Sequence, residues 1–262
     1  MHAVEALGQY IDLCLLQADG ARVHRIGSRI SYVMFLSVVN RALAVQSGAR
    51  DGFAHEAEPI VRSLLNASGS FLYLATKPAS ELDGYAFLYW LHAERVGLDR
   101  AKELEKAGRI DKVTVDEMRA QIRQAMDDHR KAARADGITI PPKPGRRPDT
   151  WTGYTDKELL EQVGAGAWYD IYYRYLSSGV HVDATTIADD LRALARGSAE
   201  VGPRFRYAFG VLRVTVEVLH GCMLAVHRLF SVGDIRAIDQ AKAAIDRELA
   251  ALMQAELELM AE

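Results

Sequence analysis

The chain has little cysteine and almost no strand-like alternation of apolar and polar residues. Cys14 and Cys222 are its only two cysteines. Both lie among apolar neighbours, and neither belongs to the Cys-x-x-Cys pair of a metal or redox site. We therefore interpret both thiols as small buried side chains in a reducing compartment, rather than as a disulfide.

Targeting signals and long apolar runs are also missing. The N-terminus has no basic flank followed by an apolar run and a cleavage site, and no stretch approaches the roughly 18 uncharged apolar residues of a membrane span. We expect a cytoplasmic protein that does not bind membranes. The formal net charge of −3 gives no overall attraction to nucleic acid, so such binding would need a local basic patch.

The common catalytic motifs are absent, including Gly-x-Ser-x-Gly, the Walker phosphate loop, Gly-x-Gly-x-x-Gly and His-Glu-x-x-His. The chain has one Glu-x-x-His pair, Glu217 and His220, whereas a di-metal bundle needs two such pairs and two further carboxylates. We predict no metal site and no cofactor. Together with Arg213 and His227, this pair is interpreted as a polar network that joins its helix to neighbouring helices.

Helical periodicity dominates the sequence and predicts an all-α fold. The clearest helix covers residues 203–231, where apolar side chains recur at alternating steps of four and three from Phe205 to Phe230. A second apolar row runs from Val211 to Leu229, so this helix has more than one apolar face. We predict a multi-helix bundle around it, formed by a single domain over residues 1–262.

Seven further helices are expected at 2–18, 23–47, 55–77, 79–96, 155–178, 184–195 and 234–260. Residues 97–152 are predicted to form a charged helical arm and a loop insertion, with Thr114 and Glu117 as the capping box of the arm's long helix. Four prolines exclude a helix from residues 137–152, where Lys143, Arg146 and Arg147 add positive charge. This segment is predicted to be a linker, a lid or an arm.

Chemically active side chains gather between Tyr173 and His181. An imidazole that titrates near neutrality can act as a general acid and base, and a guanidinium can hold a phosphate. Arg174 and His181 are seven residues apart, which places them on nearly the same face of a continuous helix. We assign His181 and Arg174 as catalytic candidates, and Tyr173 and Ser177 as groups that orient or bind the ligand.

Arg62 and Asn66 lie one turn apart on the expected helix 55–77 and are both predicted to face inward. One interpretation is a hydrogen-bonded pair between helices; the other is an anion contact by the Arg62 guanidinium. Arg62 is therefore a third catalytic candidate, and Asn66 a binding candidate.

Two sequence elements suggest a family. One is Tyr-x-x-Leu-Ser-x-x-x-His, formed here by Tyr173, Leu176, Ser177 and His181. In the other, Arg62 is followed four residues later by Asn66. In both elements the chain resembles a bacterial all-helical family of unknown function, over residues 55–185 and by extension the whole bundle.

In that family an acid usually stands four residues after the early arginine. Asn66 in its place implies a site that has lost a charge, or one in which Glu94 or Glu217 supplies it. The resemblance implies a helical fold and a site, but no reaction.

A looser resemblance is to the HEPN superfamily of helical bundles, in which an Arg-x4–6-His motif supports metal-independent RNA cleavage, usually across a dimer. Arg174 and His181 match the upper limit of that spacing, although Tyr175 stands where a polar residue is usual. This resemblance implies a ribonuclease-like effector of the toxin or phage-defence type that acts on RNA as a homodimer.

Two functions remain open at this point. In the first, the protein is such a ribonuclease. In the second, it is a non-catalytic regulatory or ligand-binding module, in which Arg62, Asn66, Tyr173 and His181 form a buried polar network or hold a small anionic ligand. The sequence does not decide whether the protein is an enzyme.

Overall fold

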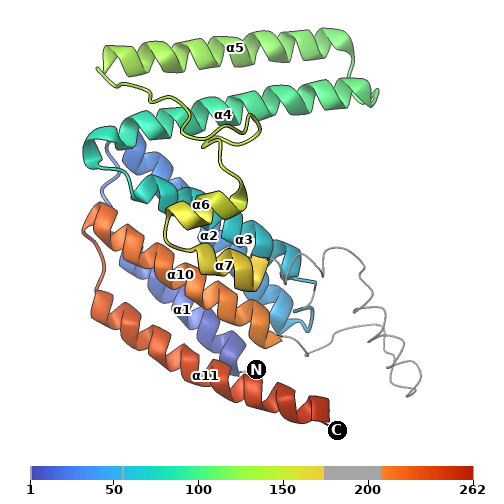
Figure 1. Cartoon of the computed structure of the whole chain (residues 1–262), viewed down its shortest axis with the longest axis vertical. Helices are drawn as coiled ribbons and strands as arrows, with labels where there is room; N and C mark the ends of the chain where they lie inside the picture. Colours follow the sequence, from blue (N-terminus) through green and yellow to red (C-terminus); the bar gives the residue numbers. More distant parts are fainter. Residues whose placement is uncertain (1, 55, 174–207, 262) are drawn as a thin grey trace.

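The computed structural model describes residues 2–54, 56–173 and 208–261. Within these ranges the chain forms helices joined by loops, with no strand (Figure 1). The predicted all-α fold is confirmed. Arg174, Ser177 and His181, together with the expected helix at 184–195, lie outside the described residues.

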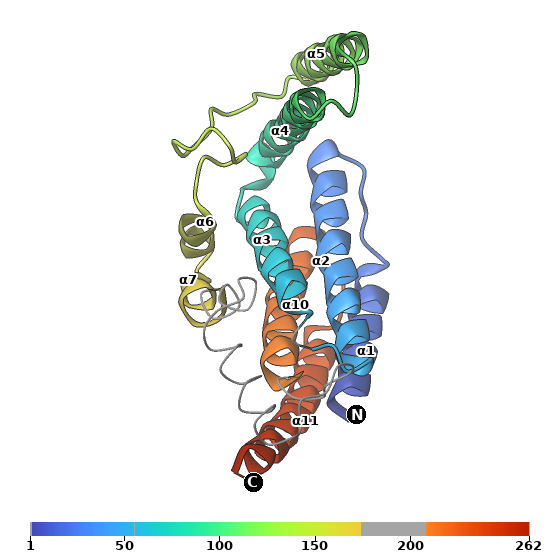
Figure 2. The same ribbon diagram turned by 90° about the vertical axis from the view of Figure 1, so that its right-hand side faces the viewer.

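Five helices form the bundle: α1 (His2–Ala18), α2 (Ile26–Arg50), α3 (Glu58–Ala75), α10 (Ala208–Phe230) and α11 (Ile235–Ala261). Helix α10 packs against the other four (Figure 2). Its buried side chains lie on several faces, as Val211, Leu212 and Val216 illustrate. The prediction of a central apolar helix is confirmed for its described part, residues 208–230.

Both cysteines lie in this core as free thiols. Burial raises the pKa of Cys14 to about 12 and also raises the pKa of Cys222. Neither thiol ionises readily near neutral pH, so the interpretation of both as structural side chains is confirmed.

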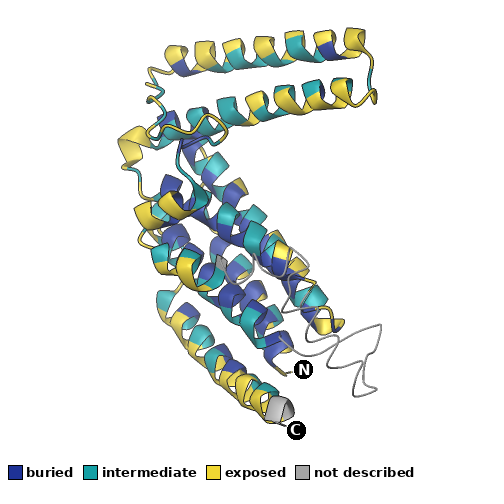
Figure 3. Ribbon diagram, turned by 45° about the vertical axis from the view of Figure 1, so that its right-hand side comes forward, coloured by how far each residue is buried: buried dark blue, intermediate teal, exposed yellow. Residues whose placement is uncertain are grey.

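Helices α4 (Ala79–Lys106) and α5 (Lys112–Ala135) form an antiparallel hairpin across one end of the bundle (Figures 1 and 2). Most of α5 faces solvent, and only Val115 and Ala133 of this helix are buried (Figure 3). The predicted charged arm, which begins at residue 97, corresponds to the second half of α4 and to α5. The residues at which its helices begin and end differ from the prediction.

The predicted helix end at residue 96 is wrong, because α4 continues through Gly97 to Lys106. A glycine costs a helix only about 1 kcal/mol relative to alanine, and the packing of α4 against α5 offsets this cost. The predicted capping box is also wrong. Asp111 is the N-cap of α5, and its Oδ1 accepts a hydrogen bond from the Thr114 backbone N–H at 2.8 Å.

The segment between α5 and α6 is not helical, as predicted, and it folds back onto the bundle as a strap, defined here as residues 137–155. Trp151 is its anchor: the side chain is buried, its ring packs against Tyr73 and Tyr89, and its Nε1 donates to Ser70 Oγ at 3.2 Å. Near its start the strap passes so close to α4 that Gly84 leaves no room for a Cβ atom.

The predicted continuous helix at 155–178 is wrong over its described part. The chain instead forms α6 (Asp156–Gln162), the short α7 (Gly166–Trp168) and a π-helical turn, η1 (Tyr169–Tyr173). Gly164 adopts a φ of +75°, in the left-handed region that favours glycine, and this ends α6. The break lets Leu159 and Leu160 of α6 pack against Gly69 of α3.

Two described helices, α2 and α10, are long and apolar enough by length and composition to cross a membrane. The most apolar window of α10 is 61% buried inside the bundle, and that of α2 is 39% buried. A buried core helix of a bundle passes the same test, so the cytoplasmic location stays a prediction.

Candidate functional site

Arg62 and Asn66, the two candidates on α3, differ in their surroundings. Both are partly buried, but only Asn66 lines a groove between α2, α3 and α4. Tyr173 is the last residue of η1. The proximity predicted between the α3 residues and Arg174, Ser177 and His181 stays a prediction.

The groove has a volume of about 470 Å³. Its apolar surface comes from α2 and from Ala67 and Ala93, and the aromatic rings of Tyr89 and Trp90 line the α4 side. Six further lining residues are polar: Arg29, Ser37 and Arg41 on α2, and Ser63, Asn66 and Ser70 on α3. The combination of an apolar wall and a few convergent polar groups is typical of small-molecule sites.

Arg41 is held in place at the groove by two serines. Its Nε donates to Ser63 Oγ at 2.8 Å, and its Nη1 donates to the Ser37 carbonyl oxygen at 2.8 Å and to Ser37 Oγ. These partners are neutral, so they orient the guanidinium without neutralising its charge.

The groove is electrostatically one-sided. Its lining contains Arg29 and Arg41 but no carboxylate, and neither arginine has an ion-pair partner in the described part of the chain. Elsewhere in the fold, arginines pair with acids, as Arg213 does with Glu217 and Asp246. The groove is therefore suited to an anion.

Asn66 carries an unsatisfied polar atom. Its Oδ1 is buried and accepts no hydrogen bond from any described residue. A buried unpaired polar atom is unfavourable by about 1–3 kcal/mol. Asn66 therefore lowers the free energy of unfolding relative to a residue whose polar atoms are paired.

The aromatic wall is fixed from behind. The Trp90 ring contacts His129 of α5 with 3.8 Å between ring centroids, and it stacks on Phe87 at 6.3 Å with an interplanar angle of 19°. Tyr89 packs edge-on against Trp151 of the strap, at 5.5 Å and 89°. The arm and the strap thus both support the rings that line the groove.

Sequence reasoning missed most of this site, namely Arg29, Arg41, Ser63 and Trp90. Part of the signal was present: Ser63, Asn66 and Ser70 recur at steps of three and four, which places a polar stripe on one face of an otherwise apolar helix. The contribution of α4 could not be found in this way, because it depends on how α4 crosses α2.

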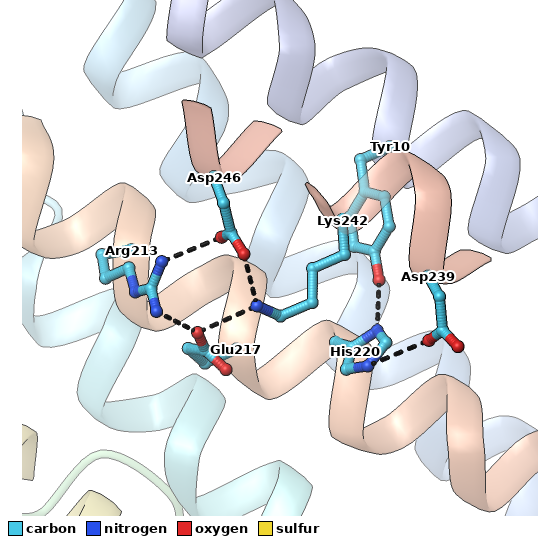
Figure 4. A network of polar contacts seen from close by, with 7 residues as sticks. All are labelled: Tyr10, Arg213, Glu217, His220, Asp239, Lys242 and Asp246. Atoms are coloured by element: carbon cyan, nitrogen blue, oxygen red, sulfur yellow. Dashed lines mark hydrogen bonds and ion pairs between the residues drawn. The ribbon is translucent and has the colours of Figure 1, made fainter. Parts of the chain in front are cut away.

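A second polar cluster joins α10 to α11 and α1 (Figure 4). Arg213 contacts Glu217 at 2.6 Å and Asp246 at 2.8 Å, and Lys242 contacts the same two carboxylates at 3.1 and 2.8 Å. One turn further along α10, His220 Nδ1 lies 3.1 Å from Tyr10 Oη. The predicted polar network between helices is confirmed for Arg213, Glu217 and His220.

His227 makes a more local contact, since its Nδ1 lies 2.8 Å from the carbonyl oxygen of Val232, just beyond the end of α10. Glu217 and His220 have separate partners, and no group of three or more potential metal ligands occurs among the described residues. In this part of the chain, the Glu-x-x-His spacing therefore serves helix packing.

Another hollow, of about 540 Å³, lies where the outer half of α4 meets the strap. Its lining mixes cations with anions, such as Arg95 and Arg100 with Asp99 and Asp149. Because these charges offset one another, this hollow shows no preference for a ligand of either sign.

A family model described as a family of unknown function (DUF5677) matches residues 29–198. No curated protein and no solved structure matches the chain. The matched range contains every residue that lines the groove, as well as the Tyr173–His181 element. It excludes α1, α10 and α11, and with them the polar cluster of Figure 4.

Proposed function

We propose, from the premise that the chain belongs to the DUF5677 family of unknown function, that the protein is a ligand-binding helical module which holds a small anionic ligand in the groove between α2, α3 and α4. The match covers more than half of the chain and includes the whole groove.

The observation that carries this proposal is the absence of a counter-charge. Arg29 and Arg41 line one groove that has no carboxylate, and neither forms an ion pair within the described residues. A guanidinium orients well toward phosphate or carboxylate because its donors form a planar fork. The hydroxyls of Ser37 and Ser63 already hold the fork of Arg41, so little side-chain entropy is lost on binding.

Titration calorimetry with pyrophosphate tests the proposal. We expect saturable binding, and at least a tenfold weaker affinity in Arg41→Met, because a charge-assisted hydrogen bond contributes about 1.5–3 kcal/mol. Arg29→Met provides a second variant whose side chain is more exposed. Arg247→Met on the exposed face of α11 is the matched control and should bind as the wild type does.

Lack of saturable binding by the wild-type protein would contradict the proposal. Equal affinities of the wild type and both groove variants would contradict it as well. Thermal unfolding of each variant shows whether a lost affinity reflects a lost fold.

A ribonuclease-like effector is the second candidate. It is favoured by the Arg174 and His181 pair in the sequence, by the looser HEPN resemblance, and by a cationic groove in the same family-matched range. In this proposal His181 is the general acid and base, while Arg174 and Arg62 hold the scissile phosphate, oriented by Tyr173 and Ser177. The protein then acts on RNA as a cytoplasmic homodimer.

Cleavage of labelled RNA in the presence of EDTA tests this candidate. If it is correct, the wild type cleaves, whereas His181→Ala and Arg174→Ala lose cleavage but stay folded. Intact RNA after incubation with folded wild-type protein would leave the binding module as the proposal.

A further inference from the structure

We infer that the ligand of the groove is a nucleoside monophosphate, whose base lies against the aromatic wall and whose phosphate contacts Arg41. This inference rests on the proposed anion-binding function and adds the chemical class of the ligand. It follows from the order in which the groove presents its chemical groups.

Helix α3 sets that order. Ser63 contacts Arg41 at one end of the groove, and Ser70 contacts Trp151 at the other, where Trp151 packs against Tyr89. The two serines are seven positions apart, which corresponds to about 10 Å along the helix axis. Arg41 therefore marks a cationic end of the groove and the rings mark an aromatic end, separated by about the distance from the base to the phosphate of a mononucleotide. The second arginine, Arg29, lies twelve positions before Arg41 on α2, about 18 Å along the helix axis, and is not part of the cationic end.

The aromatic end is a prepared stacking surface. His129 and Phe87 hold the Trp90 ring, while Trp90 and Tyr89 still line the groove. Stacking of a base on an aromatic side chain contributes substantially to binding and does not depend on base identity. The neighbouring apolar side chain of Val33 is 64% exposed, so a ring seated here would also cover apolar surface.

Asn66 lies between the two ends and offers the edge contact. The side-chain amide presents an adjacent acceptor and donor, a pattern that pairs with the hydrogen-bonding edge of a base. Its Oδ1 has no partner among the described residues. Rotation about χ2, a soft torsion in asparagine, turns this oxygen toward a base N–H in the groove.

An inorganic anion alone would use only the cationic end, and an apolar ring alone would use only the aromatic end. A nucleoside monophosphate uses both ends together with the unpaired amide between them.

The test compares AMP with ribose 5-phosphate by titration calorimetry on the full chain. We expect AMP to bind at least tenfold more tightly, because only AMP adds base stacking and the amide contact. Trp90→Leu and Asn66→Leu should each weaken AMP binding toward the affinity of ribose 5-phosphate, and each should weaken AMP binding more than it weakens ribose 5-phosphate binding. Asn66→Leu keeps the test informative if Trp90→Leu does not fold.

The outcomes separate the two proposals. Equal affinities for AMP and ribose 5-phosphate would overturn the nucleotide assignment and leave the anion site in place. Failure of both ligands and of pyrophosphate to bind would overturn the anion site itself. Much tighter binding of hexaadenylate than of AMP would also overturn the assignment to a free mononucleotide, in favour of a nucleic-acid strand.

Discussion

Tyr10 of α1 and His220 of α10 are hydrogen-bonded to each other, with 3.1 Å between Tyr10 Oη and His220 Nδ1. Tyr10 is only 2% exposed, and burial strongly raises the pKa of its phenol, so the hydroxyl stays protonated. Because the Asp239 carboxylate can only accept, a neutral His220 ring places its proton on Nε2, and Nδ1 then accepts from the Tyr10 hydroxyl. The other ring nitrogen, Nε2, then carries the proton and faces Asp239 Oδ1 at 3.5 Å (Figure 4). One imidazole thus joins α1, α10 and α11.

Loss of the Tyr10 hydroxyl should weaken the fold. Tyr10→Phe leaves His220 Nδ1 without its donor in a partly buried position, and we expect a loss of about 1–2 kcal/mol in the free energy of unfolding. Urea unfolding measures this change. Tyr32→Phe is the control, because Tyr32 packs edge-on against Phe230 through its ring, so its hydroxyl should matter little.

Acid should destabilise the protein through His220. Burial lowers its pKa, and the nearby Lys242 lowers it further, against opposing contributions from Asp239, Glu217 and Asp246. The folded state therefore favours the neutral ring. This stabilisation is complete above the unfolded pKa of about 6.5 and is lost as the pH falls through the lower folded pKa.

We expect the free energy of unfolding to fall between pH 7.5 and 5.5, and to fall less in His220→Gln. His92 must be varied in parallel, because its pKa is lowered too. Burial is the largest cause, and the nearby charges of Lys143 and Arg95 add to it. An unchanged pH dependence in His220→Gln would argue against a role for this ring.

The ion cluster on α10 and α11 should contribute more to the free energy of unfolding than a surface ion pair does. Lys242 is 17% exposed and contacts both Glu217 and Asp246, so Lys242→Met leaves two carboxylates sharing Arg213. We expect a loss of about 1–2 kcal/mol by urea unfolding, between the values for exposed and buried pairs. Lys102→Met, which breaks a pair with the exposed Asp99, is the control and should reduce stability less than Lys242→Met does.

Asn66→Leu should stabilise the protein while it impairs ligand binding. The substitution removes an unpaired buried oxygen and supplies an apolar side chain of similar size, so we expect a gain of about 1 kcal/mol in the free energy of unfolding. Asn40→Leu, at an exposed position of α2, should change stability by less than about 0.5 kcal/mol. A destabilised Asn66→Leu would show that the amide has a structural partner after all.

The strap should detach from α4 in Gly84→Ala. A Cβ atom at this position would collide with the Thr139 carbonyl oxygen, and overpacking of this kind costs about 1–3 kcal/mol. Limited trypsin digestion should then cut faster after Arg146, the one basic residue of the strap that is not followed by proline. In Gly97→Ala on the same helix, the new Cβ lies 3.7 Å from Ile122 Cδ1. That control should be cut no faster, and should gain up to about 1 kcal/mol in stability.

The parts of the fold that local pattern decides were predicted well. Helix α1 begins and ends where its apolar spacing indicates, and the apolar seams of the described α10 predict its central place because a helix covered on several faces must be buried. The errors occur where local signals compete. Gly97 lies inside α4, whereas Gly164 ends α6, and only the packing around each glycine separates the two cases.

The candidate site was predicted only in part. Asn66 was found because it interrupts an apolar helix, but Arg41 follows a run of mixed residues on α2 and gives no signal of what it faces. Trp90 was missed because an aromatic residue in an amphipathic helix usually belongs to the core. Its place in the groove depends on how α4 crosses α2. The periodicity of apolar residues shows which face of each helix is buried, but not how two helices cross.

Helix α4 forms part of both the groove and the exposed arm. Its first half carries Tyr89 and Trp90 along the groove, and its second half runs without interruption into the arm as far as Lys106. Trp90 and Lys106 are about 24 Å apart along the helix axis. Such a rod acts as a lever: a tilt of about 10° at the groove end moves the far end by about 4 Å. A displacement of Trp90 at the groove would therefore be amplified at the exposed α4–α5 tip, about 24 Å away along the same helix.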